Sequence, residues 1–140
     1  MSVTCPNRGI ISIIQQSRQN RAWSVPGLLE QLKQDLGSKF VADLIATFLD
    51  HLAAALPVVA AASATGDLRI VAKEIHSLKG SSRQLEIEVI GTICEQIELL
   101  AKENKLREVQ LLVKRLEEDS KVVRRGLGAY IDSLSAGPVQ

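Results

Sequence analysis

Residues 75–82, Ile75-His76-Ser77-Leu78-Lys79-Gly80-Ser81-Ser82, decide how the rest of the chain is interpreted. In a helix, positions three and four apart lie on the same face, so Lys79 and Gly80 lie beside His76. The spacing places a nucleophilic imidazole next to a positive charge and a stretch of bare backbone. Glycine costs about 1 kcal/mol relative to alanine in a helix interior. Gly80 therefore indicates clearance for a group that must approach His76.

The apolar periodicity around this stretch predicts that His76 is exposed. At about 100° per residue, one stripe of the helix is apolar and consists of Leu68, Val71, Ile75, Leu78 and Ser82. A neighbouring strip faces outward and consists of Ala72, His76, Lys79, Gly80 and Arg83. We therefore predict a histidine at the border of the apolar face and not in the core. Taken alone, a histidine near a lysine on a helix is also what an ordinary solvated surface contains.

The rest of the chain has helical periodicity and no alternating pattern typical of a strand. Helices are predicted over residues 24–36, 39–64, 68–84, 87–103 and 105–134. Pro57 is predicted to kink or break the second helix. Gly37 is expected to stop the first helix, Ser38 to cap the second, and Asp67 to cap the helix that bears His76. Short connections favour antiparallel neighbours, so the expected fold is an all-α bundle.

Length and composition restrict the class of protein. The 140 residues suit one domain, predicted over residues 24–135, with a tail or short helix at 1–23 and a tail at 136–140. A net charge of +1 offers no basic face for nucleic acid. Cys5 and Cys94 are too few for a zinc site or a disulfide framework, and Cys94 is expected to be a buried thiol. No apolar run approaches the ~20 residues of a membrane span, which leads us to expect a cytoplasmic protein without a membrane segment.

The run from His76 to Ser82 resembles the signature of histidine-containing phosphotransfer (HPt) domains of multistep phosphorelays, and the resemblance covers roughly residues 27–135. It implies an antiparallel four-helix bundle, often with an additional N-terminal helix. The histidine of such a domain accepts a phosphoryl group from an aspartyl phosphate and passes it to another aspartate. The implied partners are receiver domains of response regulators or hybrid histidine kinases. The resemblance implies a monomeric phosphocarrier without turnover of its own and without a cofactor or metal, because Mg²⁺ belongs to the receiver domain.

The resemblance also implies a role for individual residues. His76 is the phosphoacceptor, Lys79 offsets the charge of the phosphate, and Gly80 lets the receiver domain come close. The partner of the other ring nitrogen comes from the next helix at position 98, where family members carry glutamine or, in some cases, glutamate. From the residues alone, Glu98 is equally well a solvated helix residue. The receiver-docking surface is expected to include Ala72, Lys73, Gly80 and Arg83.

Some features leave alternatives open. The family often has a glycine near the position of Glu86, so the shape of the turn after the His76 helix is in question. His51 is the other histidine, but no Lys-Gly pair follows it. A phosphoacceptor region of a sensor kinase usually has a proline about five residues after its histidine, where this chain has Ser81. The main alternative is an HPt-like adaptor or inhibitor that binds a kinase or receiver domain without being phosphorylated.

Overall fold

The structure is a computed structural model, and it describes residues 23–136, with side chains up to residue 134. The helices of this part are α2 (Gly27–Leu36), α3 (Ser38–Thr65), α4 (Leu68–Gln84), α5 (Glu88–Lys102) and α6 (Leu106–Ala136). No strand occurs among these residues. The tails predicted at the two ends lie almost wholly outside the described residues.

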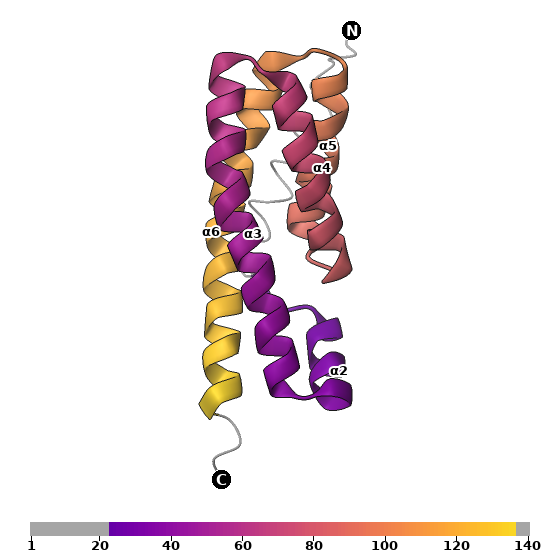
Figure 1. The fold of residues 1–140 in the computed structure, drawn as a ribbon, viewed down its shortest axis with the longest axis vertical. Coiled ribbons are helices and arrows are strands. Elements are labelled where there is room, and N and C mark those ends of the chain that lie inside the picture. The colour runs from indigo at the N-terminus through magenta and orange to yellow at the C-terminus, as the bar shows by residue number, and fades with distance from the viewer. Residues whose placement is uncertain (1–22, 137–140) are drawn as a thin grey trace, which may run out of the picture.

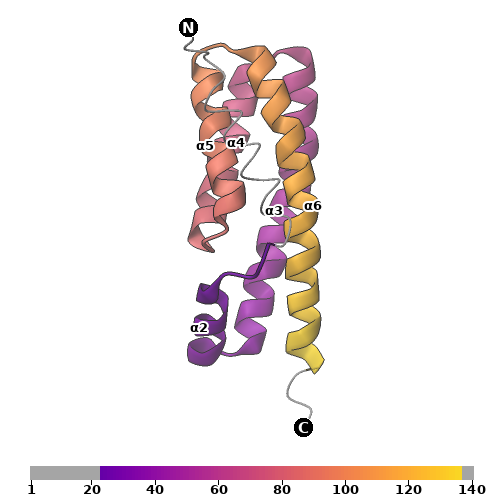
Figure 2. The ribbon, with the colours of Figure 1, turned by 180° about the vertical axis from the view of Figure 1, so that it is seen from behind.

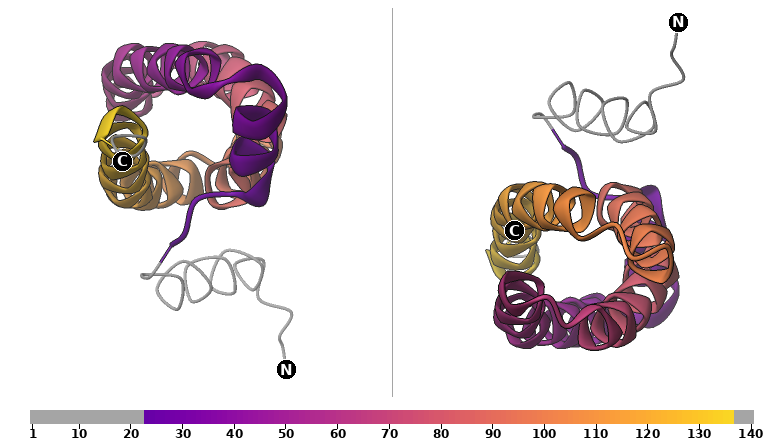
Figure 3. Two further views of the ribbon diagram at one scale, coloured as in Figure 1. Left: turned by 90° about the horizontal axis from the view of Figure 1, so that it is seen from below. Right: turned by 90° about the horizontal axis from the view of Figure 1, so that it is seen from above.

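Four of the helices form an antiparallel bundle. Viewed along the long axis, α3, α4, α5 and α6 stand at the corners of a square, and each packs against the next, with α6 returning to α3 (Figure 3). The helices α3 and α6 run along most of the molecule, whereas α4 and α5 cover only one half of it (Figure 1). The other half of α3 is covered by α2 (Figure 2). The predicted all-α fold, a four-helix bundle with an additional N-terminal helix, is confirmed.

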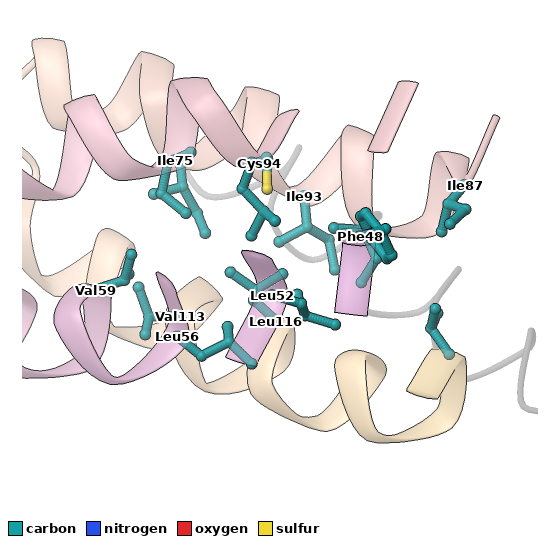
Figure 4. Packing of buried hydrophobic residues seen from close by; sticks show 14 of the residues in the cluster. Phe48, Leu52, Leu56, Val59, Ile75, Ile87, Ile93, Cys94, Val113 and Leu116 are labelled. Atoms are coloured by element: carbon teal, nitrogen blue, oxygen red, sulfur yellow. The ribbon is translucent and has the colours of Figure 1, made fainter. Parts of the chain in front are cut away.

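The core is built from aliphatic side chains of all four bundle helices, with Phe48 as its buried aromatic residue (Figure 4). The predicted stripe of α4 faces this core. Val71, Ile75, Leu78 and Ser82 are buried, and Leu68 is partly buried. Because this stripe faces inward, the neighbouring strip with His76 lies outside the core.

Three of the helices end in the same way, with a residue of left-handed backbone conformation. These residues are Gly66 (φ 84°), Glu86 (φ 59°) and Asn104 (φ 59°). In each case the amide of the following residue donates to the carbonyl five positions back: Asp67 to Ala62 (2.8 Å), Ile87 to Ser82 (2.9 Å) and Lys105 to Leu100 (3.0 Å). These are the bonds of a Schellman motif. The turn after α4 therefore forms without glycine, and Glu86 adopts the conformation that glycine adopts most easily.

Two local features differ from expectation. Of the kink or break predicted at Pro57, the break does not occur, because α3 continues from Ser38 to Thr65. The proline is exposed while Leu56 and Val59 on either side are buried, so packing on the core holds the helix together across the missing N–H bond. Ser38 does not cap α3 but is its first residue, after Gly37. The cap predicted at Asp67 is confirmed, because its side chain accepts a hydrogen bond from the Ile70 amide (3.2 Å).

The long helix α3 also corrects a statement based on composition. Among the helices of residues 23–136, it is long and apolar enough to cross a membrane by length and composition alone. A core helix of a bundle passes the same test. Here α3 buries Val41, Ile45 and Leu52 in the bundle core and exposes Asp43 and Asp50.

Candidate functional site

His76 lies on the outer side of α4, and 70% of its side chain is exposed. The prediction that it is a surface residue is confirmed. Its position follows from the register of α4, which begins at the Asp67 cap and points Ile75 and Leu78 into the core. The ring is therefore accessible to a second molecule while its backbone is held by a packed helix.

The inner nitrogen of the ring is held by a carboxylate of the next helix. Nδ1 of His76 lies 2.8 Å from Oε2 of Glu98 on α5. Because a carboxylate only accepts, Nδ1 donates and the lone pair of the neutral ring is on Nε2. Within residues 23–136, no hydrogen bond to Nε2 is made. Glu98 is thus not a solvated helix residue: it is 7% exposed, and its side chain reaches the ring as the resemblance implied.

Two lysines lie close to the carboxylate of Glu98. Nζ of Lys79 lies 2.7 Å from Oε1, and Nζ of Lys102 lies 3.7 Å from Oε2. Burial alone would raise the pKa of the Glu98 carboxyl, but Lys79 and His76 together outweigh burial and hold the pKa below its usual value. The carboxylate is therefore ionised at neutral pH. Lys102 was missed by the sequence analysis, although its spacing of four residues from Glu98 on one helix could have revealed it.

The surface next to His76 is open at Gly80. A Cβ atom added to Gly80 would have no neighbour within 4 Å, so the fold does not require glycine there for lack of space. Of the other residues predicted to contact a receiver domain, Lys73 is exposed and Ala72 is partly buried against the core. These residues lie on the same side of α4 as His76 by helical spacing.

Arg83 differs from the other predicted docking residues because its guanidinium is already paired. It forms ion pairs with Glu95 and, at 3.9 Å, with Glu88, both on α5. Its side chain crosses α5 at Gly91, where an added Cβ would lie 3.1 Å from Cγ of Arg83. Arg83 thus links α4 to α5 at one end of the strip.

His51, the other histidine, lies at the seam between α3 and α4 and is partly buried. Its Nδ1 is 2.7 Å from Oγ of Ser81, and its Nε2 is 3.3 Å from Oγ of Ser77. Both ring nitrogens are therefore engaged by serines of the motif. His76 differs in that Nδ1 is held, whereas Nε2 has no hydrogen-bond partner in the described part of the chain. The geometry favours His76 as the nucleophile.

Two further observations concern other chemistry. Burial raises the pKa of the Cys94 thiol to about 12, so this residue stays a neutral thiol, as the sequence predicted. Within residues 23–136, no group of three or more His, Cys, Asp or Glu side chains is arranged to hold a metal ion.

Comparison with known proteins agrees with this geometry. The family model described as Hpt domain matches residues 43–136, which contain α4, α5, α6 and most of α3. No curated protein sequence and no solved structure matches the chain. The match covers more than half of the chain and includes both His76 and Glu98. The chain belongs to the Hpt domain family and has a phosphotransfer-type role in two-component signalling.

Proposed function

We propose that the protein is a phosphocarrier that accepts a phosphoryl group on His76 from the aspartyl phosphate of one receiver domain. It then passes the group to an aspartate of another receiver domain. The observation that carries this proposal is the asymmetry of the ring: Nδ1 is held by buried Glu98, whereas Nε2 is exposed and has no partner among the described residues. A carrier of this kind is regenerated only by the second transfer and has no turnover of its own.

The step is a displacement at phosphorus. The lone pair of Nε2 forms the N–P bond while the P–O bond to the receiver aspartate breaks, and its electrons leave with the aspartate carboxylate. The proton on Nδ1 stays in place, and the positive charge that develops on the ring faces Glu98. Phosphoryl transfer requires mainly positioning and charge stabilisation from a protein. The hydrogen bond from His76 to Glu98 positions the ring, and Lys79 and Lys102 supply positive charge beside it for charge stabilisation.

The receiver domain would dock on the outward strip of α4 that contains Ala72, Lys73, His76, Gly80 and Arg83. An in-line transfer brings the partner's aspartyl phosphate directly to Nε2, so the partner must approach closely. The open space at Gly80 supports this orientation, because no side chain of the described residues fills it. Lys73 is available to an acidic partner surface, whereas Arg83 is shared with Glu95 and Glu88.

The test is transfer from receiver domains that carry a labelled aspartyl phosphate. Wild type, His76→Gln and His51→Gln are incubated with each donor, and the label is tested for the acid lability and base stability of phosphohistidine. We expect label on wild type and on His51→Gln, and none on His76→Gln. Label on His76→Gln but not on His51→Gln would move the site to His51. A wild type that binds several receivers but takes no label would instead indicate an adaptor.

A further inference from the structure

The charges around Glu98 are not balanced in the free protein. Among residues 23–134, one carboxylate faces two lysine ammonium groups, those of Lys79 and Lys102, so a positive charge remains in excess beside the ring of His76. A phosphoryl group on Nε2 brings a charge of about −1.5 to −2 at neutral pH. The cluster therefore holds a cation that the unphosphorylated state does not need.

The two lysines differ in how firmly they are held. Lys79 lies 2.7 Å from Oε1, and its side chain is only 22% exposed. Glu98 itself is 7% exposed, and a buried carboxylate that loses its cation is strongly destabilising. Moving Lys79 toward a phosphate would leave that carboxylate with much less compensation. Lys79 therefore stays in its ion pair with Glu98.

Lys102 is held much more loosely. Lys102 is the last residue of α5, and its side chain is 66% exposed. Its Nζ lies 3.7 Å from Oε2 of Glu98. An exposed ion pair of this kind contributes only about 0–1 kcal/mol, so leaving it costs little. Oε2 is also the oxygen that accepts the bond from His76, which places the Lys102 ammonium next to the ring. A lysine side chain has a flexible stem and acts as a mobile point charge for phosphate.

We propose that Lys102 is the cation that pairs with the phosphoryl group on His76, and that Lys79 is a positioning residue that holds Glu98. This inference rests on the proposed function. It divides between two residues the role that the family resemblance assigns to Lys79 alone. On phosphorylation, Lys102 turns from Oε2 to the phosphoryl oxygens, and Glu98 keeps both Lys79 and the Nδ1–H of His76.

The experiment measures how the phosphoryl group is distributed at equilibrium between a receiver domain and this protein. At low concentration, this distribution between the separated proteins does not depend on how tightly they dock. Lys102→Gln is expected to shift it toward the receiver by about three- to tenfold, and Lys102→Arg to restore it. The matched control is Lys105→Gln, since Lys105 is also an accessible lysine at this end of α5 but pairs with Glu103 at 3.4 Å. It is expected to behave as wild type.

A second readout tests Lys79 without any phosphate. Nitrogen-15 NMR of the unphosphorylated imidazole reports the fraction of His76 that carries its proton on Nδ1. Lys79→Gln is expected to lower this fraction, and Lys102→Gln to leave it unchanged.

An equilibrium that is the same for Lys102→Gln and Lys105→Gln, while wild type is labelled, would overturn the inference alone. The inference would also be overturned if Lys79→Gln lost phosphohistidine while the fraction of His76 with its proton on Nδ1 stayed as in wild type. Absence of label on wild type would overturn the proposed function as well.

Discussion

The ring of His76 on α4 and the carboxylate of Glu98 on α5 meet at 2.8 Å across the two helices that flank the site. The carboxylate also lies 2.7 Å from the ammonium of Lys79, so it compensates a partly buried cation as well as orienting the ring. Glu98 therefore links the two helices and also orients the ring of His76. The two contributions can be separated by substitution.

Glu98→Ala is expected to lower the free energy of unfolding by about 1–3 kcal/mol, because it leaves Lys79 without its partner and Nδ1 without an acceptor. Glu98→Gln keeps an acceptor for Nδ1 but loses the charge, so a smaller loss of stability is expected. Urea unfolding of the three proteins checks this order. Equal stability of Glu98→Ala and wild type would show that the ion pair contributes nothing to the fold.

The same carboxylate predicts a pH dependence. The pKa of Glu98 is lower in the folded state than in the unfolded chain. Its contribution is therefore present above the unfolded value, about pH 4.3, and is lost as the pH falls through the lower folded value. Stability measured from about pH 5 downward should fall less steeply in Glu98→Gln than in wild type. Identical slopes would show that the folded-state pKa is not lowered.

Gly80→Ala is expected to raise the free energy of unfolding by about 0.5–1 kcal/mol. The reason is that alanine is the better helix former and an added Cβ meets nothing within 4 Å. A larger side chain at the same position, as in Gly80→Gln, is expected to slow phosphoryl transfer by about tenfold or more through obstruction of the partner. Gly128→Gln on α6 is the control, because its added Cβ also has no near neighbour. Transfer that is equally fast in both glutamine variants would place the docking surface elsewhere.

The two glycines of α6 should respond to alanine in opposite directions. An added Cβ on Gly126 would lie 2.6 Å from Cζ3 of Trp23, so the indole must move, whereas Gly128 has open space. Gly126→Ala is expected to destabilise by about 1–3 kcal/mol, and Gly128→Ala to stabilise by up to about 1 kcal/mol. Urea unfolding followed by circular dichroism measures both, and the fluorescence of Trp23, the single tryptophan, reports the displaced ring. A stable Gly126→Ala with unchanged fluorescence would contradict the packing of Trp23 on α6.

The left-handed turns provide a second pair of opposite effects. Glu86 has a φ of 59°, which is unfavourable for a residue with a Cβ, so Glu86→Gly is expected to stabilise by about 0.5–1 kcal/mol. Gly66 has a φ of 84°, a left-handed conformation that is unfavourable for alanine, so Gly66→Ala is expected to destabilise by about 1–2 kcal/mol. The added Cβ would make only an ordinary contact of 3.7 Å with Leu106, so backbone strain and not a clash is the cause. Thermal unfolding distinguishes the two. A destabilised Glu86→Gly would mean that the side chain stabilises the turn by more than its backbone strain.

Tyr130 links α6 to α2 by donating a hydrogen bond to Oε2 of Glu30 at 2.7 Å. Burial, together with Glu30, raises the pKa of Tyr130 to about 12. Because the folded value is raised, the stability that it represents is present below the unfolded value, about pH 10, and is lost as the pH rises toward 12. As Tyr130 is the single tyrosine, ultraviolet titration follows it directly, and Glu30→Gln should lower its midpoint. A midpoint near 10 in wild type would contradict this contact.

Sequence periodicity alone determined most of the architecture. Helical geometry relates residues three and four apart whatever the helix packs against. This relation put Val71, Ile75, Leu78 and Ser82 inward and His76 outward, as the structure confirms. The Asp67 cap is equally local, since a carboxylate before a helix accepts a bond from its first turn. Of the kink or break predicted at Pro57, the break does not occur, because core packing on both sides of the proline outweighs the lost hydrogen bond.

The tertiary structure decided which side chains meet across the helices. Such contacts depend on the rotation and axial offset of each helix, which no local pattern specifies. The residues left Glu98 open between a surface and a site residue, and packing of α5 on α4 brings it to His76 and Lys79. The same holds for the contacts of His51 on α3 with Ser77 and Ser81 on α4. The exposed position of His76 beside Lys79 could be predicted from one helix, whereas the contact of both residues with Glu98 arises from the bundle.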